Sequence, residues 1–267
     1  MTPRGPHNRI TREGKNLLSV KNTGMQNLLI QKLDGYVPLT EEDKQHLDRV
    51  VQNPRQVAAH VDLIREGQQP DDVYLILEGY ACRYKITADG KRQIMAYLIP
   101  GDFCDLHVFV LKQMDHSLAT LSPCTVVNLP RTTILNLLQV PNIARAMWYA
   151  SLVDSAVLRE WLLNIGQRSG EERVAHVLCE LLVRLRAVGL TNGGAFQLPI
   201  TQNELGDTTG LSTVHVNRVL QSLRHMGLIT WKGEELVILD QKKLFAFSGF
   251  TPNYLHIAEQ NGLAQPA

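Results

Sequence analysis

The spacing of apolar residues divides the chain into stretches of different character. Between about residues 55 and 130, short β-prone runs such as VYLIL, YACRYKI, RQIMAYLI and TVVNL alternate with turn signals such as EGQQPDD, ADGK and PGD. Closely spaced short strands of this kind are typical of an antiparallel barrel or sandwich. Apolar residues then recur at helical intervals, and further short helical and β-prone runs follow. The pattern therefore predicts an α+β protein.

The N-terminal part precedes the β-rich stretch. Residues 1–24 are polar, rich in Gly, Pro and Asn, and without an apolar period, so we expect disorder. From Met25 the sequence predicts short helices. One of them has Thr40 as its N-cap, followed by three acidic residues that suit the positive end of the helix dipole.

A long apolar helix is predicted from Asn142 to about Ile165, just after Pro141 stops a shorter one. Its apolar residues recur at steps of three and four, interrupted by the polar Asp154, which fits a seam between two helices. The alternative is a helix packed on its own barrel, but its length exceeds what one small barrel face needs. We therefore expect a dimer interface at Ile143, Met147, Ala150, Val157 and Trp161.

A winged helix-turn-helix is predicted after a hinge at residues 166–170 and a further amphipathic helix. The stretch NELGDTTGLSTVHVNRVLQ, residues 203–221, indicates two short helices, with Thr201 and Glu204 as a capping box, Gly210 as the stop and Ser212 as the second cap. The following LITWKGEELVIL predicts a β-hairpin wing.

The second helix of this motif has a core face and a polar face. Its apolar residues Val216, Val219, Leu220 and Leu223 share one side, and no acidic residue occurs from 211 to 230. Arginine pairs with guanine, asparagine with adenine, and an apolar side chain meets the thymine methyl group. A solvated surface helix is the alternative interpretation, but the wing and the long helix favour DNA binding.

Composition adds limits to this picture. The chain has 267 residues, 44% of them hydrophobic, and a formal net charge of +1, which neither demands nor excludes nucleic acid. It has no run of roughly 18 apolar residues and no secretory leader, so we expect a cytoplasmic protein without a membrane partner. Four cysteines without a CxxC pair argue against a zinc finger.

From about residue 55 to 240 the sequence resembles the Crp-Fnr family of bacterial transcription regulators. YLILEGYACRYKITADGKRQIMAYLIPGDF resembles the family's cyclic-nucleotide-binding-type β-roll, and ITQNELGDTTGLSTVHVNRVLQSLRHMGLI resembles its DNA-reading motif. The resemblance implies a jelly-roll-like antiparallel β-roll, a long central dimerisation helix and a winged helix. It also implies a homodimer that binds a near-palindromic promoter site and RNA polymerase.

The expected organisation and DNA contacts follow from this resemblance. The segments are a disordered extension (1–24), a sensory β-roll (25–140), a dimerisation helix (141–166), the DNA-binding domain (167–245) and a tail (246–267). Val214, followed by His215, replaces the glutamate of many members, so the preferred half-site should differ there. The expected DNA-binding residues are Thr201, Asn203, Ser212, Thr213, Val214, His215, Asn217, Arg218 and Gln221.

The effector is not specified by the resemblance. Where cyclic-nucleotide members carry an Arg-Ser pair, this chain has His116-Ser117, so cyclic AMP is disfavoured, and the N-terminus lacks the cysteines of an iron–sulfur cluster. We expect an unknown small-molecule effector and no defined cofactor, with a redox, metal or haem sensor as an alternative. The pocket candidates are Gly101, Asp102, Phe103, Cys104, Asp105, His107, His116 and Ser117.

The sequence favours neither of two other function classes. An enzyme is disfavoured because the chain has no nucleophile elbow, phosphate loop or HExxH pattern. A cyclic-nucleotide-binding regulatory protein that acts through protein contacts would use the C-terminal unit as a docking domain. Its binding should not weaken steeply with salt, as DNA binding does.

Overall fold

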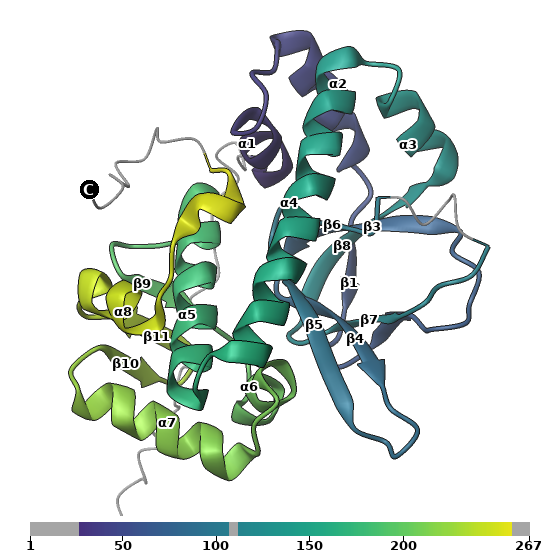
Figure 1. The fold of residues 1–267 in the computed structure, drawn as a ribbon. Coiled ribbons are helices and arrows are strands. Elements are labelled where there is room, and N and C mark those ends of the chain that lie inside the picture. The colour runs from purple at the N-terminus through teal and green to yellow at the C-terminus, as the bar shows by residue number, and fades with distance from the viewer. Residues whose placement is uncertain (1–26, 107–111, 258–267) are drawn as a thin grey trace, which may run out of the picture.

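The β-rich stretch folds into two four-stranded antiparallel sheets packed face to face. The computed structural model describes residues 27–106 and 112–257, and Figure 1 shows the β-roll on one side of the molecule. One sheet has the strand order β1-β8-β3-β6, and the other has the order β2-β7-β4-β5. The strands are β1 (Arg55–Val57), β2 (Asp62–Ile64), β3 (Asp72–Glu78), β4 (Ala81–Ile86), β5 (Arg92–Leu98), β6 (Phe103–Cys104), β7 (Ser117–Thr120) and β8 (Cys124–Pro130).

Three short helices close one end of the β-roll. They are α1 (Leu28–Asp34), α2 (Glu41–Val50) and α3 (Arg131–Leu137). The predicted cap is confirmed, because the Thr40 side chain accepts from the backbone of Asp43 and Asp43 accepts from Thr40 in return. Leu29, Leu33 and Leu47 of these helices are fully buried in the β-roll core. The helices therefore extend the core of the β-roll.

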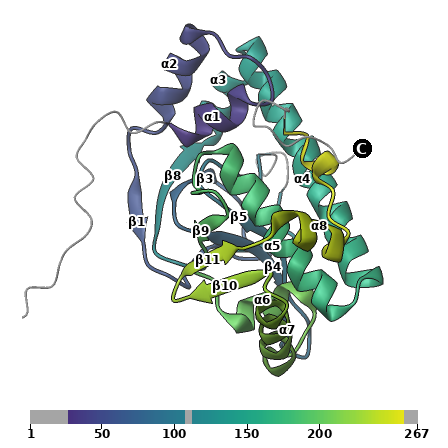
Figure 2. The same cartoon turned by 90° about the vertical axis from the view of Figure 1, so that its left-hand side faces the viewer.

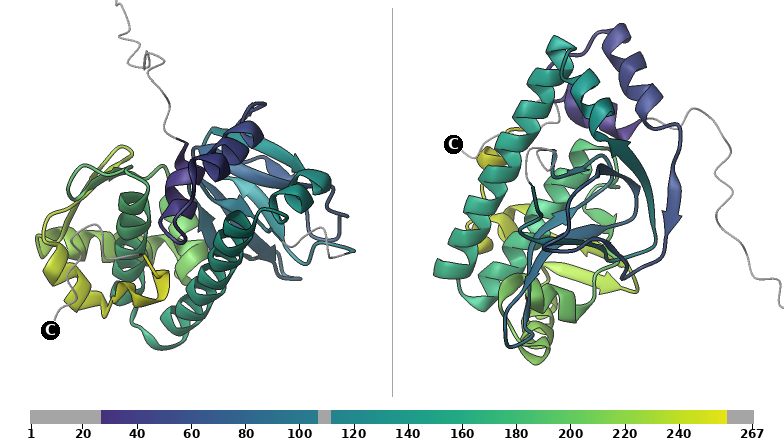
Figure 3. Two further views of the ribbon diagram at one scale, coloured as in Figure 1. Left: turned by 90° about the horizontal axis from the view of Figure 1, so that it is seen from above. Right: turned by 90° about the vertical axis from the view of Figure 1, so that its right-hand side faces the viewer.

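The long helix α4 (Pro141–Gln167) runs between the β-roll and the C-terminal unit, as the view from above in Figure 3 shows. It is 27 residues long, and Pro141 stands in its first turn, where no backbone donor is lost. Inward-facing side chains such as Ala146 and Val153 pack on the chain's own core. The helix thus forms the central support of the molecule.

The predicted dimer seam is wrong in its residues. The structure buries most of the predicted set in the same chain, so a second chain cannot reach these side chains. Four are at most 6% exposed and Ala150 is half-buried: the residues are Ile143, Met147, Ala150, Val157 and Trp161. The reason is physical, since a period of three and four detects burial but does not say which partner covers the face.

A second apolar face of α4 is exposed on the surface of the chain. At 100° per residue its members lie within an arc of about 140°. They are between 47% and 74% exposed, and we call them the α4 outer stripe: Trp148, Leu152, Leu158, Leu162 and Leu163. Exposed apolar surface of this extent on one helix is typical of an interaction site.

The C-terminal unit is a winged helix-turn-helix. Its elements are α5 (Gly170–Ala187), β9 (Ala195–Gln197), α6 (Gln202–Thr209), α7 (Thr213–His225), β10 (Ile229–Lys232) and β11 (Glu235–Ile238). Figure 2 shows the three-stranded sheet with order β10-β11-β9 above α7. The helical conformation is interrupted between α4 and α5 at Arg168 and Ser169, within the predicted hinge.

The segment after the wing packs back on the molecule. Helix α8 (Gln241–Ser248) lies on α5 and continues across the boundary expected at residue 245. The 3₁₀ helix η2 (Pro252–Leu255) contacts both α4 and α5, and the Tyr254 hydroxyl donates to the buried Glu180 carboxylate at 2.8 Å. In the described residues, no helix is long and apolar enough to cross a bilayer.

Candidate nucleic-acid interface and β-roll pocket

The turn between α6 and α7 is fixed by caps and by two glycines. Thr201 accepts from the backbone of Glu204, whose carboxylate accepts in return from the Thr201 backbone at 2.7 Å. Gly210 ends α6 with φ +70°, a conformation that suits glycine. A Cβ on Gly206 would lie 2.6 Å from the Leu211 carbonyl oxygen, so only glycine lets the turn pack this closely.

Helix α7 presents one face to the core and the other to solvent. The predicted core face is confirmed, since Val216, Val219, Leu220 and Leu223 are all at most 2% exposed. Ser212 caps the helix by accepting from the His215 backbone. On the outer face Val214 is 63% exposed, which is unusual for an apolar residue unless it meets a partner.

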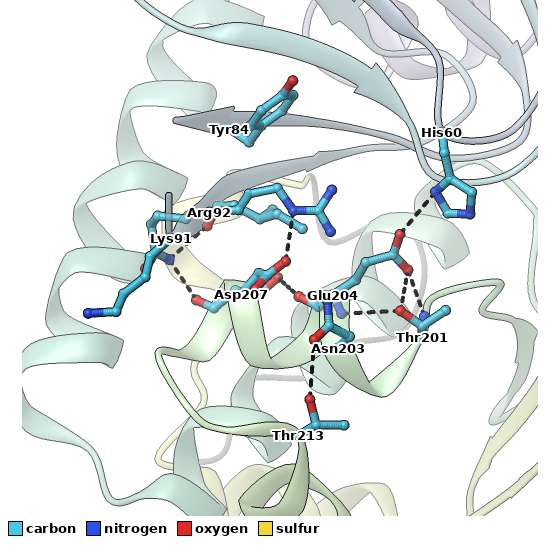
Figure 4. Close-up of polar contacts among 12 residues, drawn as sticks. His60, Tyr84, Lys91, Arg92, Thr201, Asn203, Glu204, Asp207 and Thr213 are labelled. Carbon is cyan, nitrogen blue, oxygen red and sulfur yellow. Dashed lines mark hydrogen bonds and ion pairs between the residues drawn. The ribbon is translucent and has the colours of Figure 1, made fainter. Parts of the chain in front are cut away.

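The structure brings the predicted DNA-binding residues together on one exposed surface. The Thr213 hydroxyl donates to the Asn203 side chain at 3.2 Å, as Figure 4 shows. The Asn217 amide donates to the Gln202 side chain at 3.1 Å, which links the two helices again. The members of this surface are exposed: Thr201, Asn203, Ser212, Thr213, Val214, His215, Asn217, Arg218 and Gln221.

His215 lies at one edge of this surface. Its imidazole lies against Gly170, the first residue of α5, because a Cβ built on Gly170 would be 3.1 Å from His215 Nε2. The side chain therefore contacts the hinge as well as flanking Val214. The sequence pattern placed His215 on the flank of the helix but gave no signal of this contact.

A cavity of about 330 Å³ lies where the β-roll faces α4. Its described lining includes four of the predicted pocket residues: Gly101, Phe103, Asp105 and His116. Cys104 and Ser117 are buried in strands and do not line it, and His107 lies outside the described residues. The fold therefore brings only some of the predicted pocket residues together in this cavity.

Arg83 of β4 is the residue of this cavity that the sequence reasoning missed. Its Nε lies 2.8 Å from Asp105 Oδ1, and its Nη2 donates to Asp154 Oδ2 at 2.8 Å. Burial alone would lower the pKa of Arg83, but the charges of Asp154 and Asp105 raise it, so the guanidinium stays charged. The polar Asp154, which interrupts the apolar series along α4, was the available signal for such a partner.

His116 bridges two carboxylates in the lining of the same cavity. Its Nε2 lies 2.9 Å from Asp105 and its Nδ1 lies 2.7 Å from Asp115. Burial lowers the pKa of His116, but the hydrogen bond and charge of Asp105, together with Asp115, outweigh this and raise it. The two carboxylates around His116 therefore favour its protonated form.

Asp102 faces a second, larger cavity of about 580 Å³ between α1, α4 and α5. It forms ion pairs with Lys32 and with Arg184, whose Nη2 lies 2.8 Å from Asp102 Oδ2. Burial alone would raise the pKa of Asp102, but these two cations lower it. Asp102 thus ties the turn between β5 and β6 to α1 and α5.

The cysteines and histidines form no metal site in the part of the chain that the structure describes. Cys104 is 1% exposed, and burial raises the pKa of its thiol well above the usual value. Cys179 is also fully buried, and burial raises its pKa to about 12. Such thiols are poor ligands and poor nucleophiles.

Helix α6 is docked on the β-roll of the same chain. Arg92 Nε donates to Asp207 Oδ2 at 2.7 Å, and His60 Nδ1 lies 3.5 Å from Glu204 Oε1 (Figure 4). The buried Tyr97 hydroxyl forms a hydrogen bond with the Thr208 hydroxyl. The orientation of the DNA-binding surface therefore depends on contacts with the β-roll.

Comparisons with known proteins agree on both halves of the chain. Residues 54–140 match the cyclic nucleotide-binding domain model, and residues 172–247 match the Crp-like helix-turn-helix domain model. The transcriptional activator protein Anr of Pseudomonas aeruginosa is 28% identical over 212 residues, which cover 79% of this chain and 86% of the relative.

Two further matches extend this result. The transcriptional activatory protein AadR of Rhodopseudomonas palustris is 28% identical over 210 residues, covering 77% of this chain and 85% of the relative. The structure of FixK2 from Bradyrhizobium japonicum aligns with a TM-score of 0.66 and 22% identity, covering 74% of this chain and 98% of that chain. The latter likeness supports the shared fold.

Proposed function

Because the chain belongs to the Crp-Fnr family of transcription regulators, we propose that it acts as a homodimer that reads a near-palindromic promoter site with α7. Its function as a DNA-binding regulator follows from the family. The residues that carry out the reading are our assignment. The family's relatives are transcription regulators, which are not enzymes.

The acid-free outer face of α7 is the observation that carries this proposal. Val214, Asn217 and Arg218 lie exposed on one surface, and the opposite face of the same helix is buried. A recognition helix needs this division, because one face anchors it while the other reaches base edges in the major groove. Arg218 supplies the donor fork that matches guanine, and Val214 supplies a surface for a thymine methyl group.

The α4 outer stripe supports the proposed homodimer. Leu162 and Trp148 are 74% and 68% exposed, and leaving large apolar side chains in water is unfavourable. A two-fold axis along α4 would pair the stripe with itself, since the same surface meets itself in a two-fold dimer. It would also set the separation of the two α7 helices. Two recognition helices about one DNA turn apart are what a palindromic site requires.

We assign residues 25–140 to a sensory β-roll, 141–166 to the dimerisation helix and 167–245 to the DNA-binding domain. The effector we propose is not cyclic AMP. His116 stands where the family's phosphate-binding arginine would be, and it is already engaged by Asp105 and Asp115. The promoter-bound dimer would contact RNA polymerase in the cytoplasm of a bacterium.

The test is a binding titration with a DNA site selected from a random pool by the purified protein. Arg218→Ala should weaken binding to the selected site by about 1–3 kcal/mol, because the bidentate contact with a base is lost. Arg49→Ala, which removes an exposed arginine of α2, is the matched control and should leave affinity unchanged.

Salt dependence separates this function from protein docking. Affinity of the wild type should fall steeply and log-linearly as salt rises, because bound phosphates release counterions. Unchanged affinity of Arg218→Ala, or binding that ignores salt, would remove α7 as the reading element. The protein-docking alternative would then be preferred.

A further inference from the structure

We propose that Arg83 is the anion-recognition residue of the β-roll cavity, and that the effector is a small organic acid whose acid group replaces Asp154 on Arg83. This inference rests on the proposed function, in which the β-roll is the sensory part. The effector would then be an acid, and its signal would pass from β4 to α4. Its acid group would occupy the position now held by the Asp154 carboxylate.

The two carboxylates that hold Arg83 differ in how firmly they are placed. The Asp105 side chain is 16% exposed, and its other oxygen is bound by His116 Nε2 at 2.9 Å. The Asp154 side chain is 45% exposed, and Arg83 is the ion-pair partner that the structure gives it. Because an exposed carboxylate can return to water at small cost, Asp154 is the exchangeable partner and Asp105 is the fixed one.

Arg184, the other arginine in the described lining of this cavity, is held by two carboxylates that are both buried. Arg184 contacts Asp102 at 2.8 Å and Glu180 at 3.1 Å, and both carboxylates are at most 4% exposed. It also donates to the Tyr97 carbonyl oxygen at 2.9 Å. An incoming anion would have to leave a buried carboxylate unpaired to reach Arg184, so Arg83 is the more accessible of the two arginines.

The cavity walls indicate the rest of the ligand. Apolar side chains line the cavity beside the Arg83–Asp154 pair, among them Met95, Leu106 and Leu158. The cavity volume of about 330 Å³ is at the small end of ligand sites. An acid group on a compact aryl or alkyl body fits this combination of an exchangeable arginine partner and apolar walls.

Exchange at Arg83 would change how α4 is held. The Arg83–Asp154 pair joins β4 of the β-roll to α4, and α4 leads directly into the hinge before α5. When the ligand takes the place of Asp154, this tie between β4 and α4 is lost. A ligand that binds only after the tie opens shifts the population toward the open state, and so toward a different placement of α7.

The experiment uses benzoate and its uncharged counterpart benzamide as probes on the full-length protein. Binding is measured by isothermal calorimetry and by the shift in Tm, at constant ionic strength. Asp154→Ala removes the internal competitor, and it should bind benzoate about fivefold more tightly than the wild type does. Ser155→Ala is the matched control, because Ser155 lines the same cavity on α4 and touches no charge of the network.

Benzamide should bind neither protein measurably, and Arg83→Gln combined with Asp154→Ala should lose the benzoate signal. Inorganic phosphate is a second probe. If Asp154→Ala binds phosphate more tightly than benzoate, the acid group of the effector is a phosphate ester rather than a carboxylate. Failure of Asp154→Ala to bind either anion, or equal binding of benzamide, would overturn the proposal. If the selected DNA site is still bound in that case, this inference fails while the proposed function stands.

Discussion

Asp102 is the carboxylate on which three separate elements of the chain converge. It pairs with Lys32 of α1 and Arg184 of α5, and its Oδ2 accepts from the Ile99 backbone at 3.1 Å. Removing the charge of one member of a buried ion network leaves the others unpaired. We therefore expect Asp102→Asn to lower the free energy of unfolding by about 3 kcal/mol, measured by urea denaturation at pH 7.

The sign of its pH dependence follows from the lowered pKa of Asp102. A carboxyl group whose pKa is lower when folded than when unfolded stabilises the fold above its unfolded pKa of about 3.9, and this stabilisation is lost as pH falls through the folded value. As pH falls below about 3.9, the stabilities of the wild type and the variant should therefore move progressively closer together. Asp71→Asn, at an exposed position, should leave the free energy of unfolding unchanged both at pH 7 and at the acidic pH values.

His116 gives a pH dependence of the opposite sign. Its pKa is raised in the folded chain, so its stabilisation is complete below the unfolded value of about 6.5 and is lost as pH rises through the folded value. Wild-type stability should therefore decline from pH 6.5 upward, and His116→Gln should flatten this decline. Urea denaturation at several pH values is the measurement, and identical slopes in both proteins would exclude His116 as the cause.

At the scale of elements, the helix caps and one face of each helix were predictable from sequence, because both are local properties. Thr40, Thr201 and Ser212 cap the helices that they were predicted to cap. The partner of a helix face is not local. The apolar period of α4 showed that Ile143 and the other residues of the series need a covered environment. It could not show which of the two apolar faces meets the chain's own core and which meets a second chain.

The candidate site was predictable to different degrees for the same reason. The α7 surface lies on one short motif, so its spacing in sequence fixes its spacing in space. The β-roll cavity is assembled from β4, the segment after β6 and α4, which are far apart along the chain. Arg83 in a strand and Asp154 in a helix become partners only when the fold brings them together.

The outer stripe of α4 makes a prediction about the assembly. Leu162→Glu places a charge in the middle of the proposed apolar interface, and burying an unpaired charge is strongly unfavourable. We expect the dissociation constant of the dimer to rise about 100-fold, which corresponds to about 2.7 kcal/mol. Analytical ultracentrifugation measures this change. Leu135→Glu on α3, an exposed apolar site outside the stripe, should leave the dimer intact.

At the scale of the whole molecule, several links join the β-roll to the DNA-binding unit, among them the Asp102–Arg184 ion pair, and two of them bear on how the units unfold. The first is the covalent hinge at Arg168 and Ser169. The second is the contact of α6 with β5, in which Arg92 and Asp207 form an ion pair of 2.7 Å whose side chains are less than a third exposed. Two domains joined by such an interface unfold in a single transition only if the interface stays intact until both unfold.

Charge reversal at this contact should uncouple the two units. Asp207→Arg places two guanidinium groups against each other, and we expect calorimetric unfolding to separate from one transition into two. Protease cleavage at the hinge should also become faster. Asp71→Arg reverses an exposed charge elsewhere and is the control. Adding Arg92→Asp restores an ion pair with the opposite polarity, so the double variant should regain a single transition. If Asp207→Arg itself still unfolds in a single transition, the Arg92–Asp207 pair is not what couples the units, and other contacts, such as the Tyr97–Thr208 hydrogen bond, hold α6 on the β-roll.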